Sequence, residues 1–145
     1  MKKSSFIIIL IILLTQSCAA TIRSRQALYH ADTLFDNRKY NEAIKSYSEV
    51  TTRYPKSYAA EEAQYLIAYT LVYYDNPDAD YARALIEFNR FIRLYPSDNK
   101  IREARNWVNV LHMLNHTINE NKTLQSSCSG DNSSKELKII VTCPQ

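Results

Sequence analysis

The chain carries one segment twice, as YNEAIKSYSEVTTRYP at residues 40–55 and as YARALIEFNRFIRLYP at residues 81–96. The copies are 41 residues apart, and self-similarity at a period of roughly 20–50 residues is typical of stacked supersecondary units. In both copies the apolar side chains recur in steps of three and four, which places them on one face of a helix. Each copy ends in Tyr-Pro, and proline cannot continue a helix. The sequence therefore predicts two related helices that end at Pro55 and Pro96.

Helical spacing continues outside the two copies. Ser57 and Asp98 follow the prolines, and their side-chain oxygens are suited to cap the next helices. The connections at residues 36–39 and 75–78 are short and polar, which forces neighbouring helices to run antiparallel. We expect an all-α fold of antiparallel helical hairpins, about two and a half of them, with helices at residues 22–36, 40–54, 58–75, 79–95 and 98–118.

The positions shared by the hairpins resemble the tetratricopeptide repeat. Its small-residue, alanine, aromatic and proline positions correspond to Ala31, Ala43, Tyr47 and Pro55, and again to Ala68, Ala84, Phe88 and Pro96. The Tyr-Pro-x-Ser run at residues 54–57, with the alanines that follow it, looks more specifically like the BamD and YbgF branch of envelope lipoproteins. The resemblance covers about residues 23–115 and implies a stacked solenoid that binds other proteins. BamD-type proteins have more repeats, and YbgF-type proteins carry a coiled coil that is not visible here.

The N-terminus has the layout of a bacterial lipoprotein export signal. Lys2 and Lys3 precede an apolar run at residues 6–14, and the small residue Ser17 stands directly before Cys18. The apolar run is too short for a bilayer-spanning helix, which needs about 20 residues. Cleavage before Cys18 would leave a new N-terminal cysteine that can carry acyl chains.

This interpretation divides the chain into a signal peptide at residues 1–17, a lipid-anchored tether at 18–22, a repeat domain at 23–118 and a polar linker and tail at 119–145. Ala19 favours the outer membrane, because aspartate after the lipidated cysteine is the usual signal for inner-membrane retention. The alternative is an ordinary secretory peptide that is cut near Ala19-Ala20 and releases a soluble periplasmic protein.

Composition excludes several classes of function. Removal of residues 1–17 lowers the formal net charge from +3 to +1, which leaves no basic field to attract nucleic acid. Gly130 is the single glycine, so phosphate-binding loops and dinucleotide fingerprints cannot be built. No arrangement of serine, cysteine, histidine or carboxylate meets the requirements for catalysis. We expect neither an enzyme nor a cofactor, and no small-molecule substrate.

Two groups of possible metal ligands have simpler interpretations. His112 and His116 stand one helical turn apart, but no third ligand is evident near them. Asp75, Asp78 and Asp80 are acidic like a calcium loop, yet the glycine and the distal glutamate of an EF-hand are missing. We expect these aspartates to form a turn and to help start the next helix.

The resemblance also indicates where a partner would bind. In tetratricopeptide repeats the first helix of each hairpin lines a concave groove for peptides. The corresponding residues here are Leu28, Asp32, Phe35, Tyr65, Tyr69, Tyr73, Asn106 and Val110. The three tyrosines are spaced four residues apart, so they form one strip along their helix, and tyrosine offers both contact area and a hydroxyl. The alternative is that this strip packs against the neighbouring hairpin. Trp107 aligns with Leu66 and is expected in the core.

The C-terminal region changes character after Asn115. Cys128 and Cys143 form an even pair once Cys18 is lipidated, and an oxidising compartment would allow a disulfide between them. The alternative is two free thiols. Residues 137–141 are strand-like and either dock or form a poorly ordered tail.

Taken together, these features predict a non-catalytic interaction scaffold anchored to the outer membrane by lipid and facing the periplasm. Its partners would be other envelope proteins, as for BamD-type assembly factors. A YbgF-like periplasmic accessory of a cell-wall or secretion machine is the alternative.

Overall fold

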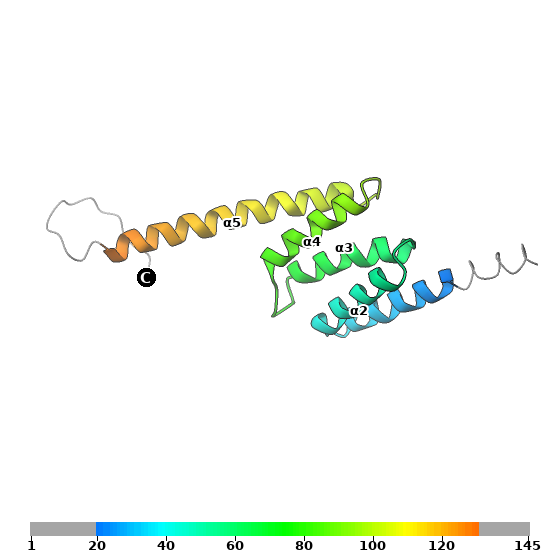
Figure 1. Cartoon of the computed structure of the whole chain (residues 1–145). Helices are drawn as coiled ribbons and strands as arrows, with labels where there is room; N and C mark the ends of the chain where they lie inside the picture. The colour runs from blue at the N-terminus through cyan, green and yellow to red at the C-terminus, as the bar shows by residue number, and fades with distance from the viewer. Residues whose placement is uncertain (1–19, 131–145) are drawn as a thin grey trace, which may run out of the picture. The chain divides into compact units, whose positions relative to one another are not determined.

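The computed structural model describes residues 20–130, and this part of the chain is helical apart from short connections (Figure 1). The first helix occupies residues 20–36, and it is followed by α2 (Tyr40–Arg53), α3 (Tyr58–Val72), α4 (Tyr81–Leu94) and α5 (Ile101–Gly130). No strand occurs between residues 20 and 130. The predicted all-α fold is therefore confirmed. Cys18 and Cys143 lie outside the described residues.

The helices follow one another as antiparallel hairpins. The first helix and α2 are joined by a tight turn in which Arg38 has a φ of 61°, and the Lys39 N–H donates to the Leu34 carbonyl at 2.9 Å. α3 then packs against α2 on one side and α4 on the other (Figure 1). Since α3 is covered by two neighbours, it is apolar on nearly all sides, as expected for a helix inside a stack.

The helix ends follow most of the predicted signals. The exceptions are α3, which ends at Val72, and α5, which begins at Ile101; Asp98 does not cap α5, because its Oδ1 accepts from the Lys100 N–H before the helix begins. α2 and α4 each stop one residue before a Tyr-Pro pair, and the N–H of each tyrosine still donates to the carbonyl four residues earlier. The Ser57 hydroxyl accepts from the Ala60 N–H at 3.2 Å and so caps α3, as predicted. Asp80 caps α4 in the same way, through the Arg83 N–H at 2.9 Å. A cap of this kind contributes about 1 kcal/mol to helix stability.

The repeat positions form the core. The four alanines of the repeat have no exposed surface at all; they are Ala31, Ala43, Ala68 and Ala84. The two aromatic positions, Tyr47 and Phe88, are also fully buried. Small side chains at the crossing points let the helices approach closely, because the distance between two helix axes depends on the side chains between them. Six of the eight positions quoted for the repeat are therefore buried, whereas Pro55 and Pro96 are exposed.

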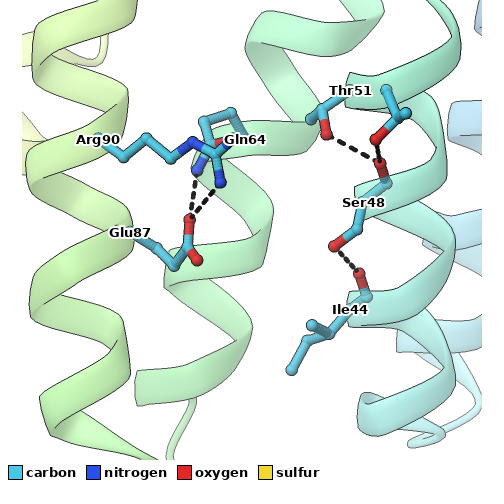
Figure 2. A network of polar contacts seen from close by, with 7 residues as sticks. Ile44, Ser48, Thr51, Gln64, Glu87 and Arg90 are labelled. Carbon is cyan, nitrogen blue, oxygen red and sulfur yellow. Dashed lines mark hydrogen bonds and ion pairs between the residues drawn. The ribbon is translucent and has the colours of Figure 1, made fainter.

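A polar contact between α3 and α4 adds specificity to this apolar packing. The Gln64 side chain is buried, and its Nε2 donates to Oε2 of Glu87 at 2.8 Å (Figure 2). Nη1 of Arg90 lies 3.8 Å from the same carboxylate oxygen. A buried amide needs a partner of this kind, since an unpaired polar group in the core would be costly. The contact therefore favours one register between the two helices.

The last helix differs from the prediction. Val108, within α5, marks the boundary between two compact units, and the second unit continues α5 from Asn109 to Gly130. The composition predicts that this helix ends at residue 118, because asparagine, serine and threonine dominate beyond it. No proline or glycine interrupts the chain between Pro96 and Gly130, however. The hydroxyls of Thr117 and Thr123 donate to the carbonyls four residues earlier, so these side chains find partners within the helix.

Two expectations for the C-terminal region remain predictions. Cys128 lies near the end of α5, but the position of Cys143 is not described, so their disulfide is untested. The strand-like residues 137–141 also lie outside the described part of the chain. Within residues 20–130, no helix combines the length and apolar character needed to cross a membrane.

We expect Phe88→Ala to destabilise the fold by about 3–5 kcal/mol, the usual cost of removing a buried phenylalanine side chain. Phe88 is completely buried and contacts Tyr65 at a ring-centroid distance of 5.8 Å. Ile86→Ala on the exposed side of the same helix is the matched control and should change the unfolding free energy by less than about 0.5 kcal/mol. Urea unfolding measures both. Equal losses for the two variants would contradict the assignment of the core.

Candidate functional site

Aromatic side chains from three helices form a continuous row, here called the aromatic strip, made of Phe35, Tyr69, Tyr73 and Trp107. Tyr69 lies at its centre, with its ring 6.3 Å from that of Phe35 and 6.4 Å from that of Trp107. Phe35 and Tyr73 meet at 4.8 Å, in an edge-to-face arrangement that aromatic pairs prefer. All four side chains are half-buried. The strip thus joins the first helix, α3 and the start of α5, and each member keeps part of its surface accessible.

Tyr65 does not share this accessibility. Only 4% of it is exposed, because its ring packs against Phe88 at 5.8 Å and Phe91 at 5.5 Å. It also stacks on Tyr69 at 6.1 Å. Tyr65 therefore packs against the neighbouring hairpin, which was the alternative to a role in the groove. Its contribution to the strip is to support Tyr69 from inside the protein.

The Tyr65 hydroxyl is an unusual feature of this core. It is buried without a hydrogen-bond partner of good geometry among the described residues. Burial raises the pKa of Tyr65, and the nearby Glu103 carboxylate raises it further. Nζ of Lys100 lies 5.4 Å from the centre of the Tyr65 ring and forms an ion pair with Glu62. Tyr65 is thus held as a neutral phenol beneath a charged surface.

One end of the strip is fixed by polar contacts between two connections. Tyr40 lies edge-to-face with Phe35 at 5.5 Å, and its hydroxyl donates to Oδ2 of Asp75 at 3.2 Å. Nε of Arg38 lies 3.3 Å from the same oxygen. Nδ2 of Asn41 donates to Oδ2 of Asp78 at 2.8 Å. These contacts connect the loop after α3 to the first hairpin. The prediction that the aspartates form a turn and start the next helix is confirmed, with Asp80 as the cap.

Asp32 is a half-buried carboxylate one helical turn before Phe35. It accepts a hydrogen bond from the hydroxyl of the buried Tyr47, at 2.8 Å. Burial raises the pKa of Asp32, the hydrogen bond from Tyr47 opposes this shift, and the carboxylates of Glu62 and Asp36 add to it. The net shift is upward, so the ionised form of Asp32 is less favourable in the folded protein than in the unfolded chain.

The structure brings together only part of the predicted set. Phe35, Tyr69 and Tyr73 are joined by ring contacts, and Asp32 lies one turn before Phe35 on the same helix face. The other three predicted residues have no aromatic ring and take no part in these contacts. Leu28 is half-buried in the first helix, Asn106 is exposed on α5, and Val110 is exposed in the second unit.

The sequence predicts that Trp107 lies in the core. Its ring does stack on the buried Phe88, at 6.0 Å and an interplanar angle of 6°. The same ring also reaches Tyr69 and stays half-buried, so Trp107 belongs to the core and to the strip. Its position one repeat after Leu66 indicated the first role. Only the long-range contact with Tyr69 reveals the second.

The two histidines of α5 belong to the second unit. Nδ1 of His116 lies 3.1 Å from Oε2 of Glu120, a surface pair one turn apart. Among the side chains that the structure describes, no three or more histidines, cysteines or carboxylates gather as a metal site would require.

We expect Asp32→Asn to stabilise the protein at neutral pH. The asparagine oxygen can still accept from Tyr47, while the ionised carboxylate, which burial disfavours, is removed. Because the folded pKa of Asp32 is raised, wild-type stability should increase as the pH falls through that value toward the unfolded value near 3.8. The advantage of Asp32→Asn should therefore shrink in acid. Urea unfolding across this pH range tests it, with Glu42→Gln as control, because Glu42 is exposed and is not among the charges that shift the pKa of Asp32. A constant difference would contradict the shift.

A comparison with known protein families places these features in context. The model of the YfiO family, described as outer membrane lipoprotein, matches residues 22–141. This range includes the hairpins, the aromatic strip and all of α5, and it covers most of the 145 residues. The family agrees with the BamD-type resemblance of the repeat positions. The chain belongs to the YfiO family of outer membrane lipoproteins.

Proposed function

We propose that this protein is a non-catalytic scaffold, anchored to the outer membrane by lipid on Cys18, that holds a segment of another envelope protein against the aromatic strip. Its role would be of the BamD type, in the assembly of outer membrane proteins. The observation that carries the proposal is the row of half-buried aromatic side chains across three helices. Membership of an outer membrane lipoprotein family supports the location.

The chemistry of the strip suits the binding of a protein segment. Tyrosine and tryptophan combine a large contact area with few rotatable bonds, so little entropy is lost when they are immobilised. The rings of Tyr69 and Tyr73 are already held by contacts with Phe35 and with each other, at 6.3, 4.8 and 5.6 Å. A side chain that is fixed before binding has less freedom to lose on association. A partner that crosses the strip would touch the first helix, α3 and α5 together.

The shifted titratable groups near the strip support a binding role better than a catalytic one. Asp32 and Tyr47 satisfy each other by a hydrogen bond at 2.8 Å, and Tyr47 is buried in the core. Burial is the largest cause of the raised pKa of Asp32 and of Tyr65 alike. Structural groups in a packed interior also have such shifts. We therefore assign these residues to the support of the strip.

The anchor is inferred from the sequence. Cys18 stands two residues before the described part of the first helix begins. Because the helix already includes residues 20–22, Ala19 alone separates Cys18 from it, and an acylated Cys18 would keep the domain close to the bilayer. Several acyl chains on one cysteine anchor a protein firmly, whereas a single chain anchors it weakly.

We expect Tyr69→Glu and Tyr73→Glu each to weaken partner binding by about thirty-fold or more, the loss typical of an aromatic hot spot. A photoreactive residue at position 69 in intact cells should capture the partner, and the same group at position 29 should not. Tyr29→Glu is the matched control, because Tyr29 is an exposed tyrosine of the first helix outside the strip. Circular dichroism checks that each variant folds. Unchanged affinity of the captured partner for both strip variants would refute the proposed binding surface.

We also expect the purified wild-type chain to begin at Cys18 and to carry the added mass of fatty acyl groups. Cys18→Ser should lose the acyl mass and its place in the outer-membrane fraction, with a fall in barrel-protein levels when it is the sole copy in the cell. A wild-type chain that begins near Ala19-Ala20 without acyl groups would contradict the anchor. Normal barrel-protein levels in cells depleted of the protein would instead favour the YbgF-like accessory role.

A further inference from the structure

The start of the first helix, the connection from α2 to α3 and the connection from α4 to α5 lie together at one end of the hairpin stack. Ala20 and Thr21 line an open surface depression together with residues 53–57, which join α2 to α3. The connection from α4 to α5 lies at the same end, since Lys100 forms an ion pair with Glu62 in the first turns of α3. We call this surface the basic end and define it as residues 20–25, 53–58 and 93–102.

The basic end carries an excess of positive charge. Its exposed cations come from each of the three segments and include Arg23, Arg25, Arg53, Lys56, Arg93 and Arg102. Asp98 is the sole carboxylate in the sequence of these segments, and it accepts the Lys100 N–H at 2.7 Å within the turn. The opposite end, at residues 36–42 and 73–83, has five carboxylates and three cations in its sequence. Charge is therefore separated along the helix axes, although the mature chain is nearly neutral.

Apolar side chains stand exposed among these cations. Ile22, Tyr58 and Leu94 are 61%, 64% and 51% exposed, and each comes from a different segment of the basic end. Pro55 and Pro96 are exposed beside them. Cations with interspersed aliphatic and tyrosine side chains are typical of protein surfaces that lie at a membrane–water interface.

We propose that the basic end lies against an anionic phospholipid surface, with its cations on the headgroups and with Ile22, Tyr58 and Leu94 at the interface. The inference rests on the proposed function in one respect, because lipid on Cys18 would hold this end, rather than the opposite one, next to the bilayer. Arg53 and Lys56 lie in the connection next to the first described residues, Ala20 and Thr21. Each cation near an anionic surface contributes favourable electrostatic energy that salt weakens.

The test uses the full processed chain, purified from membranes and reconstituted into vesicles whose acyl chains carry bromine, a quencher of tryptophan fluorescence. Trp107 is the single native tryptophan and gives the constant background. Tyr58→Trp places a second tryptophan at the basic end, and Tyr74→Trp places one at the exposed Tyr74 of the opposite end. In vesicles of phosphatidylethanolamine with phosphatidylglycerol, the tryptophan at position 58 should be quenched and the one at position 74 should not.

Charge variants complete the test. Arg53→Gln with Lys56→Gln, in the Tyr58→Trp chain, should lower the ratio of docked to undocked protein about thirty-fold. Lys39→Gln with Lys45→Gln is the matched control, since Lys39 and Arg53 each have one exposed ion pair, at 3.6 and 3.9 Å. The control pair should leave the quenching unchanged. Added salt should reduce quenching of the Tyr58→Trp chain.

Three results would overturn the proposal. They are equal quenching at positions 58 and 74, equal quenching in vesicles of phosphatidylcholine alone, and no quenching at position 58, which would assign the surface to a protein partner. The intact mass of the same preparation reports the acylation of Cys18 separately. An unacylated chain that still shows the predicted quenching would refute the anchor and support the docking surface.

Discussion

Close contact between helices at the alanine positions is the constraint on which the other features of this protein depend. Ala31, Ala43, Ala68 and Ala84 have no exposed surface, and a larger side chain at any of them would separate two helices. The short separation brings Phe88 against both Tyr65 and Trp107. The rings of Phe35, Tyr69, Tyr73 and Trp107 are only half-buried, and they form the aromatic strip beside this core.

The basic end, the aromatic strip and the acidic loop follow one another along α3. α3 begins at Tyr58 in the basic end and ends at Val72, just before the acidic loop that carries Asp75 and Asp78. Tyr69 and Tyr73 lie on this helix and directly after it, toward the acidic loop. A bilayer at the basic end and a polypeptide on the strip would therefore occupy different parts of the first unit. Such a separation lets a scaffold bind its partner without leaving the membrane surface.

Much of the fold could be predicted from local sequence signals. The Tyr-Pro pairs, the Ser57 cap and the repeated alanines each act within a few residues of themselves, and the structure has them where the pattern placed them. The length of α5 could not be predicted in this way. Composition alone favoured a linker after residue 118, whereas the absence of helix-breaking residues allowed the helix to continue to Gly130.

The candidate site shows a different limit. Tyr65, Tyr69 and Tyr73 share one helix face, so their spacing cannot separate a core residue from a strip residue. The distinction comes from Phe88 and Phe91 of α4, which cover Tyr65 and leave Tyr69 half-buried. These contacts join residues more than twenty positions apart, and no local pattern encodes them. The contact between Trp107 and Tyr69 is also long-range, so no local pattern predicts that Trp107 belongs to the strip.

The unbroken course of α5 through its polar half has a mechanical consequence. A flexible coil of the same residues would have no fixed end-to-end distance. How often its far end met a second molecule would depend on the effective concentration that the coil allows. As a helix, the part from Asn109 to Gly130 is a spacer of about 33 Å, at a rise of about 1.5 Å per residue. In such a spacer the length also sets the direction that the far end faces around the helix axis, because each residue adds about 100° of rotation. Insertion of a whole number of turns would extend its reach alone, whereas insertion of two residues would turn its far end to the opposite side.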